Sequence, residues 1–165
     1  MAASPQAAPL VFGDEQLDAL TAAARASARL RRNLNFHAAA SDPAQRLLNA
    51  VEPGSYVQPH RHLEPHKEET LVVVRGAFGL VLFAENGAVT HAAVIRAQGD
   101  RIGANIPGGT FHTLVSLEPG SVFFEAKAGP YNATADKEAA PWAPAEGSDK
   151  APAYHAQLVG LFRQL

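Results

Sequence analysis

The chain of 165 residues contains no cysteine, which excludes disulfide bonds and thiolate metal ligands. It also contains no apolar run near the ~18 residues that a membrane-spanning helix needs, so we expect no membrane segment. Residues 1–9 are rich in alanine and proline and lack the basic start and continuous apolar core of a secretory signal peptide. These absences together predict a cytoplasmic protein.

An excess of basic charge is missing as well. Fourteen basic and sixteen acidic residues give a net charge of −2, whereas nucleic-acid-binding proteins usually carry a strong basic excess. We therefore expect no nucleic-acid partner. The one basic cluster, Arg25, Arg29, Arg31 and Arg32, falls where a first helix should end, and cations there interact favourably with the helix dipole. A phosphate-binding role is the alternative for this cluster.

Short apolar runs separated by proline and glycine dominate the middle of the chain. Such runs at regular spacing, without intervening helices, favour a β-sandwich or barrel over a parallel α/β sheet. The Asn86-Gly87 pair between two of them predicts a hairpin with a type I′ turn. The expected strands are residues 46–51, 56–60, 69–75, 78–83, 89–95, 101–106, 112–116 and 122–127.

The remaining segments frame this strand-rich region. We expect a flexible tail over residues 1–12 and an N-terminal helical segment over 13–45, which starts with Asp14 as N-cap, runs as a helix to about Leu30 and packs on the barrel. The barrel should span 46–131. A C-terminal extension over 132–165 should be anchored by the single tryptophan, Trp142, and should end in a short amphipathic helix over 154–165.

Two histidines two residues apart, His60 and His62, are the first sign of a functional site. On an extended chain, side chains at i and i+2 point to the same face, so both imidazoles can reach one point. Neutral imidazole is the commonest protein ligand for transition metals. A histidine-rich exposed loop without metal is the alternative, and this spacing alone does not decide between the two.

The surroundings of this pair narrow the choice. In Gly54-Ser-Tyr-Val-Gln-Pro-His60-Arg-His62 five residues separate the glycine from His-x-His. Six residues separate Glu69 from Gly76. Further on, Pro107-Gly-Gly109-Thr-Phe-His112 reads P-x-G-x-x-H. These segments resemble the two sequence motifs of the cupin superfamily. The resemblance implies an all-β cupin jelly-roll barrel, here with an N-terminal helix and a short C-terminal helix. It also implies one divalent metal ion bound by His60, His62, Glu69 and His112, with Fe, Mn, Ni and Zn all compatible with these ligands.

The chain departs from the family pattern in three places. Six residues separate His62 from Glu69, where the motif has three or four, and the insert offers Glu64, His66 and Glu68 as alternative ligands. We favour Glu69 because its spacing to Gly76 matches and because it opens a predicted strand. In the second motif the leading glycine is replaced by Arg101, and the final asparagine by Ser116.

Over roughly residues 29–146 the chain is similar to the WbuC family of cupin-fold metalloproteins. Members of that family are associated with bacterial O-antigen polysaccharide gene clusters, which implies a context but no particular reaction. The segments that carry the resemblance are Asn33-Leu-Asn-Phe-His37, Asp42-Pro-Ala-Gln-Arg46-Leu-Leu-Asn49-Ala, Pro59-His-Arg-His62, Phe111-His-Thr-Leu-Val-Ser116, Glu125-Ala-Lys127-Ala-Gly-Pro-Tyr131 and Trp142-Ala-Pro-Ala-Glu146.

Three further residues are candidates for catalysis. Glu125 and Lys127 share one face of the last predicted strand, and they could transfer protons or hold a hydroxylated substrate if that face lines the barrel. The alternative is a solvated strand face with a charge pair. Tyr131 could cover the barrel mouth or serve packing. We interpret His37, His91 and His155 as structural or surface residues.

The function predicted from these features is that of a metal-dependent enzyme, an isomerase or epimerase, a lyase or a dioxygenase. Its substrate would be a small molecule, a carbohydrate or sugar-nucleotide intermediate of surface polysaccharide metabolism. A non-catalytic metal- or sugar-binding cupin is the alternative, since fold does not determine function. Jelly-roll sheets have faces and edges that need covering, so we also expect a homodimer.

Overall fold

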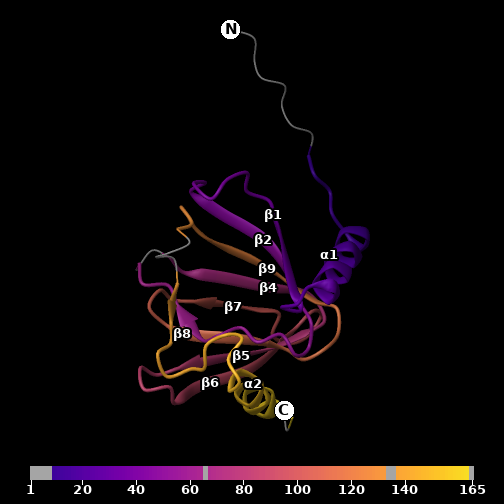
Figure 1. Ribbon diagram of the computed structural model, residues 1–165. Helices are drawn as coiled ribbons and strands as arrows, with labels where there is room; N and C mark the ends of the chain where they lie inside the picture. The colour runs from indigo at the N-terminus through magenta and orange to yellow at the C-terminus, as the bar shows by residue number, and fades with distance from the viewer. Residues whose placement is uncertain (1–8, 65–66, 133–136, 164–165) are drawn as a thin grey trace.

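The computed structural model describes residues 9–64, 67–132 and 137–163. Within these ranges the chain forms two antiparallel β-sheets of five strands each, in the orders β1-β2-β9-β4-β7 and β10-β3-β8-β5-β6 (Figure 1). Successive strands repeatedly switch from one sheet to the other, so the sheets close around a common interior. This confirms the predicted all-β jelly roll. The strands are β1 (Arg31–Asn35), β2 (Ala44–Val51), β3 (His60–Arg61), β4 (Glu69–Arg75), β5 (Ala77–Phe83), β6 (Val89–Arg96), β7 (Gly103–Ile106), β8 (Phe111–Ser116), β9 (Ser121–Ala128) and β10 (Glu138–Ala139).

Alternation of side chains gives the barrel an apolar core at one end and a polar interior at the other. In β4 the inward residues Leu71 and Val73 are buried, whereas Thr70, which precedes Leu71, points outward and is exposed. Glu69 therefore shares the inner face with these apolar residues, but lies at the end of the strand. The buried residues of the apolar core are Val51, Leu71, Val73, Phe78, Leu80, Ile95, Ile106, Leu114 and Phe123.

Helix α1 (Asp14–Ala26) covers the outer face of the first sheet (Figure 1). Leu17, Leu20 and Ala24 lie on one helical stripe and pack against buried residues of β2 and β9. The helix is shorter than predicted, because Ser27 adopts an extended conformation and Leu30 a positive φ of 53°, which turn the chain into β1. The N-cap is also one residue earlier than predicted, at Gly13.

Two strands, β1 and β10, lie in segments where only helical or irregular structure was expected. β1 pairs with β2 from Arg31 opposite Val51 to Asn35 opposite Leu47. Its sequence is mostly polar, because one face lines the barrel mouth, so it shows no apolar alternation. β10 is only two residues long and pairs with β3. The paired residues, such as Ala139 and His60, are far apart in the sequence, so no local pattern predicts this strand.

The hairpin predicted at Asn86-Gly87 is present between β5 and β6, but its turn is not of type I′. Only Gly87 of the pair has a positive φ, of 85°, and Ala84 and Ala88 are joined by a backbone hydrogen bond around a three-residue loop. A three-residue loop needs one left-handed residue, usually glycine, rather than two.

Helix α2 (Ala151–Gly160) packs on the outer face of the second sheet (Figure 1). It begins before the predicted Tyr154, with Pro152 in its first turn, where a missing N–H costs nothing. Trp142 lies upstream against the rings of Phe83 and Phe111, at centroid distances of 4.9 and 5.8 Å. In the part of the chain that the structure covers, no helix is long and apolar enough to cross a membrane.

Candidate metal centre

Four buried side chains converge at the polar end of the barrel interior: His60, His62, Glu69 and His112. One ligand atom from each lies within 4.8 Å of those of the other three. His60 on β3 is paired in register with His112 on β8, which brings together the two sequence motifs. His62 follows β3 directly, and Glu69 enters from the opposite sheet as the first residue of β4.

Backbone contacts orient two of the imidazoles. Nδ1 of His60 lies 2.9 Å from the carbonyl oxygen of Gln58, and Nδ1 of His112 lies 2.8 Å from that of Thr110. A carbonyl can only accept a hydrogen bond, so each Nδ1 carries the proton. Each Nε2 then keeps its lone pair for another partner. A hydrogen bond from the ring nitrogen that does not bind the metal, here Nδ1, is typical of metal-binding histidines.

The electrostatics of the group favour a neutral His60 beside an ionised Glu69. Burial lowers the pKa of His60 well below its usual value, and the nearby charges of Lys137 and His112 lower it further. Burial alone would raise the pKa of Glu69, but the neighbouring His112 and His62 and the charge of Lys127 lower it well below its usual value. Glu69 Oε2 lies 3.0 Å from Nε2 of His62. These are the protonation states that metal coordination needs.

The buried Nε2 atom of His112 provides a test of whether a metal fits. It has no hydrogen-bond partner within the described residues, and its nearest carboxylate oxygen, on Glu69, is 3.6 Å away. A buried polar atom without a partner is costly, and a bound cation would satisfy this lone pair. Three imidazole nitrogens and one carboxylate oxygen suit Fe(II), Mn(II), Ni(II) and Zn(II). The group can thus hold one divalent metal ion.

The insert between His62 and Glu69 does not join this group where it is described. Glu68 has the opposite parity to Glu69, is exposed, and accepts a hydrogen bond of 3.1 Å from the side chain of Asn105. Glu64 is exposed and lies 3.8 Å from the ammonium of Lys67. The remaining alternative, His66, lies outside the described residues.

A cavity of about 530 Å³ lies on the inner face of the first sheet, and it adjoins the metal centre through a strand neighbour of one of the four ligands rather than through the ligands themselves. Glu125, Lys127 and Tyr131, the three catalytic candidates, all line it. Glu125 and Lys127 are almost fully buried and form an ion pair of 3.0 Å, so they face the barrel interior rather than a solvated surface. Lys127 is also the register partner of Glu69 across β4 and β9. Tyr131 is 42% exposed at the edge of this cavity.

Sequence reasoning missed several residues of this cavity. Asn49 on β2 donates a hydrogen bond of 2.9 Å to Glu125. The available signal was that Asn49 shares a face with Leu47 in a predicted strand, and both residues line the cavity. His37, which we interpreted as a structural or surface residue, also lines the cavity, as does Lys137. Both lie in segments without a clear periodic pattern. His91 is exposed on β6, and His155 is buried on α2, away from this cavity.

The basic cluster has a structural role in ion pairs, although mostly not at the helix end. Only Arg25 lies in the last turn of α1, where it pairs with Glu52 at 3.1 Å. Arg29 and Arg31 both pair with Glu146 at 2.7 Å and also border the cavity.

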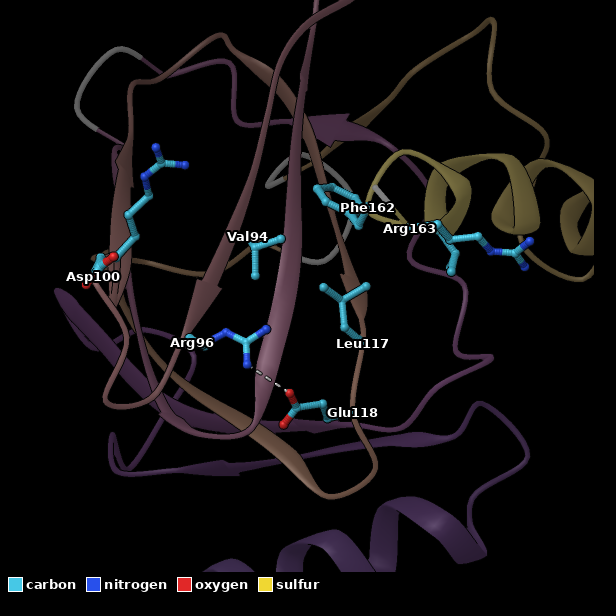
Figure 2. A pocket seen from close by; sticks show the side chains of 9 residues that line it. Val94, Arg96, Asp100, Leu117, Glu118, Phe162 and Arg163 are labelled. Atoms are coloured by element: carbon cyan, nitrogen blue, oxygen red, sulfur yellow. Dashed lines mark hydrogen bonds and ion pairs between the residues drawn. The ribbon is translucent and has the colours of Figure 1, made fainter. Parts of the chain in front are cut away.

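A second cavity, of about 550 Å³, lies on the outer face of the second sheet beside the C-terminal end of α2 (Figure 2). Val94, Leu117 and Phe162 point into its apolar part, and the ion pair of Arg96 with Glu118 closes one side. The second sheet separates it from the histidines, which point to the inner face. It is therefore not part of the metal centre.

Comparisons with known proteins agree with this fold. The family model of a domain of unknown function, DUF6016, matches residues 12–95. A search of curated proteins found no match. Among solved structures, the chain is similar to oxalate decarboxylase from Bacillus subtilis at pH 4.6, with a TM-score of 0.51 and 16% identity, over 66% of this chain and 27% of that one.

Two other solved structures are similar at lower TM-scores. KdgF from a Halomonas species matches with a TM-score of 0.48 and 22% identity, over 63% of this chain and 82% of that one. Procruciferin, an 11S globulin from Brassica napus, matches with a TM-score of 0.45 and 15% identity, over 53% of this chain and 21% of that one. The chain has the fold of the cupin superfamily, whereas the resemblance to the WbuC family stays a prediction.

Proposed function

The chain belongs to the DUF6016 family, a domain of unknown function, and from that premise we propose that it is a metal-dependent cupin enzyme acting on a small carbohydrate or sugar-nucleotide intermediate. The metal would be held by His60, His62, Glu69 and His112. The polysaccharide context rests on the resemblance to the WbuC family, whose members accompany O-antigen genes.

One observation carries the metal-binding part of the proposal. Each of two ligand imidazoles is fixed by a backbone carbonyl at Nδ1, and the Nε2 of one of them, His112, is buried without a partner among the described residues. Nε2 of His155 is also buried without a partner among the described residues, but it stands alone, whereas His112 lies with three other ligand groups. Histidines oriented through Nδ1 beside an ionised Glu69 are the arrangement that binds a cation.

When bound, a divalent ion at this site would supply Lewis acidity, polarising a carbonyl or hydroxyl group of the substrate. The chain's own residues would do the rest. The ion pair of Glu125 and Lys127 lies on the wall of the same cavity, and Asn49 holds the second carboxylate oxygen of Glu125 in place. A carboxylate and an ammonium in contact can accept a proton from one substrate atom and return it to another. Tyr131 at the cavity edge would limit the access of water.

This buried titratable pair favours an enzyme over a non-catalytic binding module. A site that only stores a metal or binds a sugar needs no carboxylate and ammonium buried beside the ligands, and burying such a pair costs free energy. Their placement next to Glu69 in strand register therefore supports a chemical role.

The proposal is tested first by elemental analysis of the purified chain. We expect about one divalent ion per chain, and a His60→Ala/His112→Ala double variant should lose it because half of the ligands are removed. His91→Ala, at an exposed position on β6, is the matched control and should keep the full metal content. Full metal content in the double variant would contradict the assigned site.

A thermal-shift screen of sugars and sugar nucleotides with the metal-loaded chain then identifies the ligand class. A ligand that binds only the native state raises the melting temperature, and the rise grows with the logarithm of its concentration once this exceeds Kd. With a hit in hand, Glu125→Gln should abolish turnover while leaving binding largely intact. Binding without turnover in the unmodified chain would favour the non-catalytic alternative.

A further inference from the structure

Lys137 is placed by strand pairing on the side of the metal ligands. In the antiparallel pair of β10 and β3, Ala139 lies opposite His60 and Glu138 lies opposite Arg61. Glu138 forms an ion pair with Arg61 on one face of this ribbon. Because side chains alternate, Lys137 leaves the opposite face, the one shared by Ala139 and His60. Consistent with this, Lys137 lines the cavity beside the metal centre.

Lys137 is exposed beside the centre, and no described residue supplies a counter-charge to its ammonium. Across residues 9–64, 67–132 and 137–163 it has no hydrogen bond or ion pair. Strand pairing nevertheless places it two residues before Ala139, the register partner of His60. A cation beside a site that binds a cation opposes metal binding. Metal retention therefore does not explain this lysine.

The rest of the cavity wall carries more positive than negative side chains, although Glu125 pairs with Lys127. Arg29, Arg31 and Lys127 line it together with Lys137, whereas Glu125 is the lining carboxylate. Glu146 balances part of the charge of the two arginines from outside the lining. The whole chain has a net charge of −2, so the positive wall is local. A cavity with one sign of charge concentrates ligands of the opposite sign.

We infer that the ligand of this cavity is an acidic sugar, a sugar carboxylate or a sugar phosphate, and that Lys137 binds its anionic oxygens at the cavity mouth. The inference rests on the proposed function and specifies its substrate class. Lys137 thereby acts as a specificity residue: it pairs with a group that a neutral sugar lacks, and the anion in turn relieves the repulsion between the ammonium and the metal.

The experiment uses the full chain, both metal-free and loaded with Zn²⁺, in calorimetric titrations with two matched pairs of probes. D-galacturonate against D-galactose tests a carboxylate, and α-D-glucose 1-phosphate against D-glucose tests a phosphate. We expect one of the acidic probes to bind at least about tenfold more tightly than its neutral counterpart. Lys137→Gln should weaken that binding about tenfold and leave the neutral sugar unaffected, as expected for one charge-assisted contact.

Lys150→Gln is the matched control, since Lys150 precedes α2 and does not line this cavity. It should bind both acidic probes like the unmodified chain. Lys137→Gln should also bind Zn²⁺ more tightly than the unmodified chain, because the variant removes a cation beside the site.

Two results would overturn the inference: unchanged binding of the preferred acidic probe by Lys137→Gln, or no binding of either acidic probe by the unmodified chain at millimolar concentration. Failure of the unmodified chain to bind Zn²⁺ would contradict the proposed metal centre instead. The titrations of the metal-free chain would still decide the role of Lys137 in that case.

Discussion

Glu68 and Glu69 are neighbours in the sequence, yet their side chains lie on opposite faces of the first sheet. Glu69 is almost fully buried among the histidines, while Glu68 is exposed and bonded to Asn105. The difference comes from the ladder of β4, which begins at Glu69 and pairs it with Ile106 on one side and Lys127 on the other. A ligand held by strand pairing keeps its orientation better than one in a loop.

This contrast predicts different effects of two equivalent substitutions. Glu69→Gln keeps the shape but removes the negative charge, so it should weaken metal binding by at least about tenfold, as expected for loss of a charged ligand. Glu68→Gln should leave metal binding unchanged. Competition with a metal-binding dye measures both affinities. The reverse outcome would mean that the insert shifts the strand register by one residue in solution.

At the scale of elements, a salt-bridge cluster joins the start of β1 to the C-terminal extension. Glu146 accepts hydrogen bonds from Arg29 and Arg31, with N–O distances of 2.7–2.8 Å. Arg31 also donates to the hydroxyl of Ser55 and to the carbonyl of Tyr56. Tyr56 itself packs under α2 and donates to the carbonyl of Pro144. Residues 56–60 were expected to form a strand. Only His60 and Arg61 form that strand, because the preceding residues make these contacts instead.

The cluster predicts a specific acid sensitivity. Hydrogen bonds from Arg29, followed by those from Arg31, together lower the pKa of Glu146 to about 2. Burial alone would raise this pKa. A depressed folded-state pKa adds stability above the unfolded value near 4.5, and that stability is lost as the pH falls toward 2. Glu146→Gln should therefore lower the free energy of unfolding by about 1 kcal/mol at neutral pH, the upper end for an exposed pair. This difference should vanish near pH 2.

Urea denaturation at several pH values measures this difference. Glu118→Gln, which breaks the exposed pair with Arg96, is the control and should have a smaller effect at neutral pH. A Glu146→Gln variant as stable as the unmodified chain at every pH would mean that the cluster orients these segments without stabilising them.

At the scale of the whole molecule, the two helices leave part of the first sheet uncovered. α1 lies over β1, β2 and β9, while β7 is an edge strand paired only with β4 within the described residues. Val74 on β4 and Ile102 just before β7 are 39% and 52% exposed. Exposed edges with apolar side chains are usually covered by another chain or element.

This uncovered edge is consistent with the homodimer expected from the sequence, which stays a prediction. We expect light scattering at micromolar concentration to give twice the mass of the chain. An Ile102→Lys variant should shift the equilibrium toward monomer, because a charge at an apolar contact must lose its hydration on association. A monomeric mass for the unmodified chain would contradict the prediction.

Much of the fold was predictable because its signals are local. Seven of the predicted strands agree with observed ones to within two residues at each end. They are rich in β-branched and aromatic residues and are bounded by glycine and proline turns. β1 and β10 were not predictable in this way. The polar residues of β1 lack alternation, and the two residues of β10 become a strand only because β3 lies beside them.

The sequence by itself determined the convergence of His60 and His62, because the period of an extended chain places them on one face. The resemblance of two motifs to those of the cupin superfamily implied that His112 and a carboxylate would join them. Only the tertiary structure decided that Glu125 and Lys127 face the interior, that Asn49 holds Glu125, and that Lys137 lies beside His60. Periodicity states which residues of a strand share a face. Which strand pairs with which, and therefore which face is inside, depends on contacts between residues up to 84 positions apart, such as Ala44 and Ala128.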